Sequence, residues 1–145
     1  MQKKEIFEII NINPIIFLGT VDGTEPRVRA MLLYKADENG IVFHTGPIKE
    51  VYHQILKNPN VEMCFYDFAQ NIQIRVRGAL EKIDDISYKE EISKHPTRAF
   101  MQAWKANCKS MDEFYNMFSV FRLKNGKAHV WTFEKNFEPK EYIIL

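Results

Sequence analysis

Cysteine, net charge and long apolar runs are all scarce in this chain. Among 145 residues there are two cysteines, and 20 Lys plus Arg against 19 Asp plus Glu leave a formal net charge of +1. Cys64 and Cys108 lack CxxC spacing, so we expect free thiols in a reducing, cytoplasmic compartment. The even charge balance provides no broad field for nucleic acid or an anionic membrane surface, and we expect neither as a partner.

Several signatures of catalysis and targeting are missing as well. The four histidines show no HExxH spacing, and neither a GxSxG elbow nor a Walker sequence is present. A metal site, a hydrolase and a P-loop enzyme are therefore unsupported. The stretch after Met1 contains Glu8 and Asn11, unlike a signal peptide, and the apolar run around residues 15–18 is far shorter than the roughly 20 residues of a membrane span.

The chain does contain many short extended runs separated by turn dipeptides. Asp22-Gly23, Asn39-Gly40 and Asn125-Gly126 are typical of hairpin turns. Strands are expected over residues 15–21, 27–34, 41–45, 61–68, 72–83, 117–123 and 127–133. Helices are expected over residues 3–12, 48–56, 85–94 and 97–107. This order predicts one mainly β domain over residues 1–145, an antiparallel barrel with helical inserts.

The segment Thr45-Gly46-Pro47-Ile48-Lys49 predicts an anion site. A strand, a glycine and a helix amino terminus bring backbone N–H groups to one point, and Lys49 adds a positive charge in the first turn. Unpaired N–H groups and the helix dipole favour phosphate there. The alternative is an ordinary strand-to-helix connection with a solvated lysine.

Further candidates lie on predicted strands. Arg27 and Arg29 share one strand face and could present two guanidinium groups to a phosphate or a planar ring, although solvated strand arginines are commoner. The amide of Gln73 could pair with a heterocycle. Trp131 could touch a planar ligand, with a core or interface role as the alternative.

A family resemblance ties these candidates together. The ordered fragments Phe17–Asp22, Pro26–Arg29, Phe43–Gly46, Lys49, Asn58–Val61 and Arg75–Gly78 resemble the pyridoxamine 5′-phosphate oxidase-like flavoproteins over nearly the whole chain. The short length is similar to that of the nitroimidazole-resistance branch. The resemblance implies a split β-barrel that forms a homodimer, with FMN held between the subunits. It implies flavin contacts from Arg27, Val28, Arg29 and Ala30, phosphate contacts from Thr45, Gly46 and Lys49, and a ring contact from Gln73.

The chain also departs from that family. It has Pro47-Ile48-Lys49 in place of a Ser-Arg-Lys phosphate cluster, and Tyr34 in place of a strand lysine. It ends in the apolar tail 141–145 rather than in an arginine-bearing substrate motif. Oxidation of vitamin B6 is therefore not expected, and substrate recognition does not transfer.

The leading hypothesis is an FMN-dependent oxidoreductase that passes hydride or electrons from a small-molecule donor to a small aromatic acceptor, such as a nitro compound or a quinone. Flavin chemistry needs no protein nucleophile, and no catalytic residue is identified. The alternatives are a protein that only binds or stores FMN or haem, and a barrel that has lost its ligand.

Overall fold

Eight strands and six short helical segments follow one another along the chain. The computed structural model describes residues 1–145. The helical segments are α1 (Lys3–Ile12), α2 (Glu50–Lys57), α3 (Ile86–Lys94), the 3-10 turn η1 (Pro96–Arg98), α4 (Met101–Ala106) and α5 (Met111–Tyr115). The strands are β1 (Ile15–Asp22), β2 (Glu25–Asp37), β3 (Gly40–Thr45), β4 (Asn60–Asp67), β5 (Ile72–Lys82), β6 (Ser119–Leu123), β7 (Lys127–Trp131) and β8 (Ile143–Ile144).

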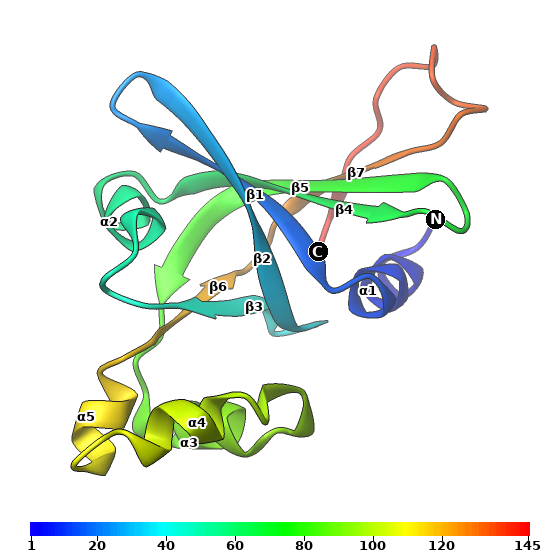
Figure 1. Cartoon of the computed structure of the whole chain (residues 1–145). Coiled ribbons are helices and arrows are strands. Elements are labelled where there is room, and N and C mark those ends of the chain that lie inside the picture. Colours follow the sequence, from blue (N-terminus) through cyan, green and yellow to red (C-terminus); the bar gives the residue numbers. More distant parts are fainter.

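Six antiparallel strands close into a barrel in the order β1, β2, β3, β6, β5, β4, with β4 pairing back to β1 (Figure 1). Strand β5 has two partners on the same side. Its first half, from Gln73 to Arg77, pairs with β7, and its last three residues pair with β6. Gly78 lies between the two halves, where a Cβ would meet the Leu123 side chain at 3.4 Å. The predicted split barrel is confirmed.

Alternating side chains fill the barrel. On β1 the side chains of Ile16 and Leu18 are buried, as the two-residue period of a half-buried strand requires. Helix α1 covers one open end of the barrel, with Ile6 and Ile10 fully buried against the strands. The predicted helix over residues 3–12 is confirmed, because its apolar residues fall on one face.

The predicted hairpin turns adopt the backbone that their residue types favour. Gly23 and Gly40 have φ values of 64° and 121°, and Asn125 has a φ of 56°. Side chains larger than those of Gly and Asn rarely adopt such positive φ angles. These dipeptides therefore set the strand boundaries locally.

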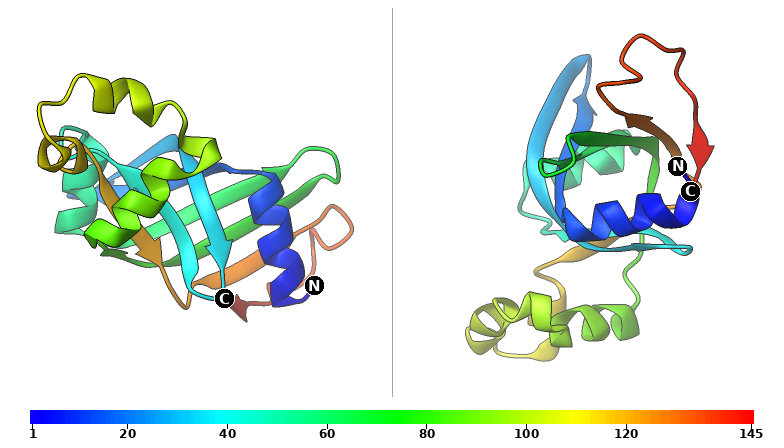
Figure 2. Two further views of the ribbon diagram at one scale, coloured as in Figure 1. Left: turned by 90° about the horizontal axis from the view of Figure 1, so that it is seen from below. Right: turned by 90° about the vertical axis from the view of Figure 1, so that its right-hand side faces the viewer.

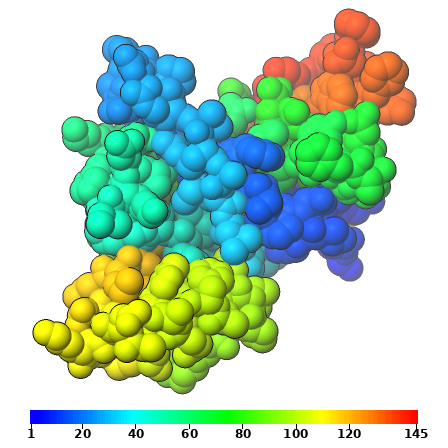
Figure 3. Space-filling view, viewed as in Figure 1, coloured from blue at the N-terminus to red at the C-terminus, as the bar shows by residue number.

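Residues 86–115 form a helical insert that packs on the outer face of β3 and β6 (Figure 2). Its contacts with the barrel form a second apolar cluster, which contains Val42, Ile92, Met101, Phe114, Tyr115, Phe118 and Val120. The space-filling view shows the insert as a separate lobe below the barrel (Figure 3). None of the helices combines the length and the apolar character that a membrane span requires.

Several predicted boundaries differ from the structure, and three of them concern the site and the insert. Helix α2 begins at Glu50 rather than Ile48, because Lys49 has an extended backbone. The predicted helix over 97–107 is divided into η1 and α4, and the sequence reading missed α5. The strand predicted over 117–123 begins at Ser119, since the Met117 N–H closes a turn onto the Phe114 carbonyl.

Candidate functional site

The end of β3 and the start of α2 form one wall of a cavity of about 290 Å³, called the α2 cavity below. It is lined by His44, Thr45, Gly46, Ile48, Lys49, Trp104, Met117 and Phe118. The three residues predicted to hold phosphate, Thr45, Gly46 and Lys49, are therefore brought together.

The turn into α2 leaves backbone N–H groups without a capping side chain. The Lys49 N–H donates to the Gly46 carbonyl at 2.9 Å, and no side chain caps the helix. The next N–H groups of the first turn have no intrahelical acceptor. A Cβ on Gly46 would lie 2.8 Å from the Met117 carbonyl oxygen, so the close approach of the two segments requires glycine.

His44 is the residue of this cavity whose state the structure defines best. The buried Arg98 guanidinium donates through Nε to His44 Nε2 at 2.8 Å, and its Nη2 donates to the Leu33 carbonyl at 2.7 Å. Burial, with the Arg98 charge adding to it, lowers the pKa of His44 to about 4. Because Nε2 accepts a hydrogen bond, the proton of the neutral ring resides on Nδ1.

Sequence reasoning missed His44, Trp104, Met117 and Phe118. His44 lies inside the Phe43–Gly46 fragment that was singled out, and its outward position follows from the strand period. Trp104, Met117 and Phe118 are contributed by the insert and the segment after it, about 60 to 75 residues away in the chain. No local pattern places them at β3.

Arg29 on β2 forms hydrogen bonds to both β1 and α2. Its Nη1 donates to Thr20 Oγ1 at 2.7 Å, and its Nη2 donates to Gln54 Oε1 at 2.6 Å. Burial, and secondly the charge of Arg27, lowers its pKa. Arg29 thus connects β1 to α2, and its partner on α2, Gln54, lies five residues after Lys49.

Arg27 shares that strand face, as predicted, but it is engaged by carboxylates. Its Nη2 lies 2.8 Å from Glu25 and 3.7 Å from Asp22. It lines a separate polar cavity of about 270 Å³ with residues of α2. Val28 and Ala30 point the other way, onto the exposed outer face of β2.

Gln73 and Trp131 form a cross-strand pair on β5 and β7. The indole Nε1 donates to Asn136 Oδ1 at 2.8 Å. The β4–β5 hairpin next to this pair lies at the opposite end of the barrel from α2 in both Figure 1 and Figure 2. One chain therefore does not bring Gln73 and Trp131 to Lys49.

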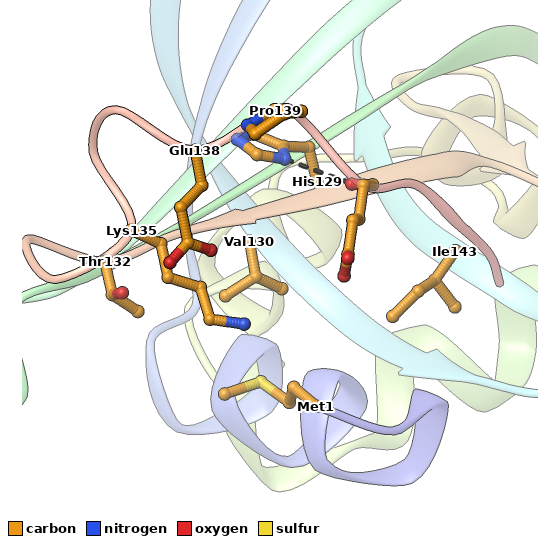
Figure 4. Close-up of a pocket in the computed structure, with 9 residues that line it drawn as sticks. Met1, His129, Val130, Thr132, Lys135, Glu138, Pro139 and Ile143 are labelled. Atoms are coloured by element: carbon orange, nitrogen blue, oxygen red, sulfur yellow. Dashed lines mark hydrogen bonds between the residues drawn. The ribbon is translucent and has the colours of Figure 1, made fainter.

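Another cavity, of about 260 Å³, lies between β7, the 132–142 loop and the amino terminus (Figure 4). His129 Nδ1 lies 3.1 Å from the Glu141 carbonyl in it. Lys135 and Glu138 lie across the same space. None of the predicted site residues lines this cavity, so it is separate from the site at α2.

Part of the chain is similar in sequence to known proteins. The chain is 36% identical over 90 residues to the pyridoxine/pyridoxamine 5′-phosphate oxidase of Brucella anthropi, and 34% identical over 90 residues to that of Brucella ovis. The matched segments are 61% of this chain and 44% and 43% of those proteins. The chain thus spans less than half the length of the curated relatives that it matches.

Solved structures show the same fold. A NimC/NimA family protein from Clostridium acetobutylicum matches with a TM-score of 0.75 and 22% identity, over 98% of this chain and 92% of that one. A pyridoxamine 5′-phosphate oxidase-related, FMN binding protein from Nostoc punctiforme PCC 73102 matches with a TM-score of 0.65 and 19% identity, over 97% of this chain and 88% of that one.

The sequence pattern described as Pyridoxamine 5′-phosphate oxidase matches residues 2–132, which include the whole closed barrel and the α2 cavity. The solved structures share the fold of this chain, and the ordered fragments that carry the family resemblance all lie within the matched residues. The chain belongs to the pyridoxamine 5′-phosphate oxidase family.

Proposed function

We propose that this protein binds FMN with its phosphate in the α2 cavity, and that it acts as an oxidoreductase on a small aromatic acceptor. The observation that carries the proposal is the meeting of Gly46, Lys49 and the start of α2 in one cavity. Arg27 is paired with carboxylates, whereas Lys49 forms no ion pair. Lys49 is therefore a free cation beside free backbone donors.

The donor set and the size of the cavity fit the phosphate end of FMN. Backbone N–H groups, a lysine and the Thr45 segment are ordinary partners of a phosphate. At about 290 Å³ the cavity lies at the small end of the range for ligand sites, which suits the phosphate and part of the sugar chain. The flavin ring would then lie outside it.

A homodimer would supply the surface for that ring. The outer faces of β1 and β2 expose Ile15, Phe17, Val28 and Leu32, and Val28 is 73% exposed. An apolar patch of this kind is typical of a protein interface. Since Gln73 lies far from Lys49 within one chain, a second copy is the natural source of a ring contact at the same flavin.

Bound FMN would supply the hydride or electron transfer between a small-molecule donor and a nitro compound or quinone. The chain's own residues have binding roles in this proposal. Lys49 and the α2 amino terminus hold the phosphate, while His44 presents an Nδ1–H donor to the cavity. Trp104 and Met117 exclude water on the side of the insert.

Lys49→Ala tests the phosphate site. Because a hydrogen bond to a charged group contributes about 1.5–3 kcal/mol, the variant should bind FMN roughly 10- to 100-fold more weakly. Riboflavin, which lacks the phosphate, should bind as it does to the wild type. Lys57→Ala, at the other end of α2, changes the net charge equally and serves as the control. Equal losses for FMN and riboflavin, or no loss for FMN, would contradict the assignment.

Turnover separates an enzyme from a binding protein. Purified protein with bound oxidised flavin should be yellow, and NADH or NADPH should bleach it. Reoxidation that depends on an added nitro compound or quinone would support the oxidoreductase. Flavin that is tightly bound but reduced by no donor would favour storage, and colourless protein that takes up no flavin would overturn both proposals.

A further inference from the structure

The outer face of β4, β5 and β7 holds a concentration of positive charge away from the α2 cavity. A hollow of about 120 Å³ there, called the cationic hollow, is lined by Arg75, Arg77, Lys127, His129 and Lys140. Glu62 is the one carboxylate in its lining, and Tyr142 completes it. Four side chains with fixed positive charge therefore surround one negative charge, in a chain whose formal net charge is only +1.

The strand register forces these cations together. Arg77 on β5 lies directly opposite Lys127 on β7, and Arg75 lies directly opposite His129. Like charges directly opposite in an antiparallel pair are destabilising. On the β4 side, Glu62 lies opposite Arg77. One carboxylate does not balance this cluster, so an anion from outside would relieve the repulsion.

The tail of the chain closes one side of the hollow. The Tyr142 ring lies 5.0 Å from the guanidinium carbon of Arg77 and 4.6 Å from Lys127 Nζ. These cation–π contacts hold both side chains in place without neutralising them. The backbone beside Tyr142 is attached to β7 as well, through the contact between His129 Nδ1 and the Glu141 carbonyl (Figure 4).

A buried donor in the hollow lacks an acceptor. Arg75 Nε is shielded from solvent and forms no hydrogen bond. The nearest carboxylate oxygen, Glu62 Oε1, is 3.8 Å away, beyond hydrogen-bonding distance. Buried N–H groups are almost always paired in folded proteins, so the Arg75 guanidinium keeps its charge with an unusually incomplete set of partners.

We infer that the cationic hollow binds a phosphate-type oxyanion. At about 120 Å³ the hollow is smaller than the roughly 300–1,000 Å³ of ordinary ligand pockets, which suits a compact ion or a single phosphate group. Gln73 on β5 and Trp131 on β7 lie on the same face of the sheet as the hollow, two residues along each strand from Arg75 and His129. The hollow could therefore take a free phosphate or the phosphate group of a ligand lying over that pair.

Isothermal titration calorimetry with inorganic phosphate, at constant ionic strength, tests the site directly. The titration uses the full chain carrying Lys49→Ala, so that the proposed FMN phosphate site cannot account for the binding. We expect one saturable phosphate site per chain. Adding Arg77→Gln and Lys127→Gln should weaken it by at least about 10-fold, because two charged partners are lost.

The matched control is Lys105→Gln with Lys109→Gln, which removes two exposed positive charges from the insert and should leave phosphate binding unchanged. Thermal melting checks that each variant is folded, and Arg77→Gln alone replaces the double variant if that one unfolds. Titrations with NADPH and NADH in place of phosphate distinguish a phosphorylated ligand from free phosphate. Binding of NADPH that is tighter than that of free phosphate, and that is lost in the Arg77 variant, assigns the hollow to a phosphorylated ligand. Equal binding of free phosphate and NADPH assigns it to phosphate itself.

Three results would overturn the inference. The first is no saturable phosphate binding to the Lys49→Ala chain, and the second is an equal loss of phosphate binding in the control variant. The third is that phosphate only converts a dimer into monomers in sedimentation velocity, which would assign the hollow to a carboxylate of a second copy. None of these results depends on whether the α2 cavity binds FMN.

Discussion

Acid should destabilise this protein through one histidine, His44. The imidazole is partly buried on β3 beside the insert, where Arg98 donates to its Nε2 at 2.8 Å. Burial, reinforced by the Arg98 charge, lowers the pKa of His44 from 6.5 to about 4. The folded chain therefore resists a proton that the unfolded chain accepts readily.

The sign and size of the effect follow from that difference. Between pH 6.5 and 4 the unfolded chain binds more protons, so the contribution of His44 is fully present above pH 6.5 and is lost as the pH falls towards 4. The difference in pKa corresponds to a loss of about 2 kcal/mol at pH 5 and about 3 kcal/mol at pH 4.

Urea unfolding at pH 7, 6, 5 and 4.5, without added flavin, measures this loss. His44→Gln keeps a hydrogen-bond acceptor for Arg98 but cannot titrate. Between pH 7 and 5 its free energy of unfolding should therefore fall by about 2 kcal/mol less than that of the wild type. His53→Gln, on the exposed face of α2, is the control and should behave as the wild type. Identical pH dependence in the wild type and His44→Gln would refute the reasoning.

Two further substitutions test the turn into α2 and the dimer face. Gly46→Ala would place a Cβ 2.8 Å from the Met117 carbonyl oxygen, so we expect a loss of about 1–3 kcal/mol in the free energy of unfolding, measured in urea. Unchanged stability would show that the turn at Gly46 and the segment that contains Met117 can separate without a cost in free energy. Val28→Asp places a charge in the exposed patch of β2 and should convert the proposed dimer into a folded monomer in sedimentation velocity. A dimer that survives this change would exclude that face as the interface.

The strands and turns could be predicted from the sequence because their signals are local. The alternation along β5 and the positive φ of Gly23 depend on a few neighbouring residues. Helix α5 was missed, since five residues carry too little periodicity to be recognised.

The candidate site was predictable only in part. Thr45, Gly46 and Lys49 lie within five consecutive residues, and the strand-to-helix turn that unites them is a local structure. Arg98 could not be placed, because a buried arginine that reaches back to His44 across 54 residues leaves no pattern in either segment. The contacts of Trp104 with the same cavity depend on how the insert packs.

The sequence by itself determined the barrel, its turns and the strand-to-helix turn that carries Lys49, because backbone conformation and two-residue periodicity are encoded over a few residues. Only the tertiary structure decided that Gln73 and Trp131 lie at the far end of the barrel from Lys49. It also decided that Arg77 faces Lys127 across a strand pair. Both depend on strand register and barrel closure, which bring together segments distant in the chain and which no local pattern specifies.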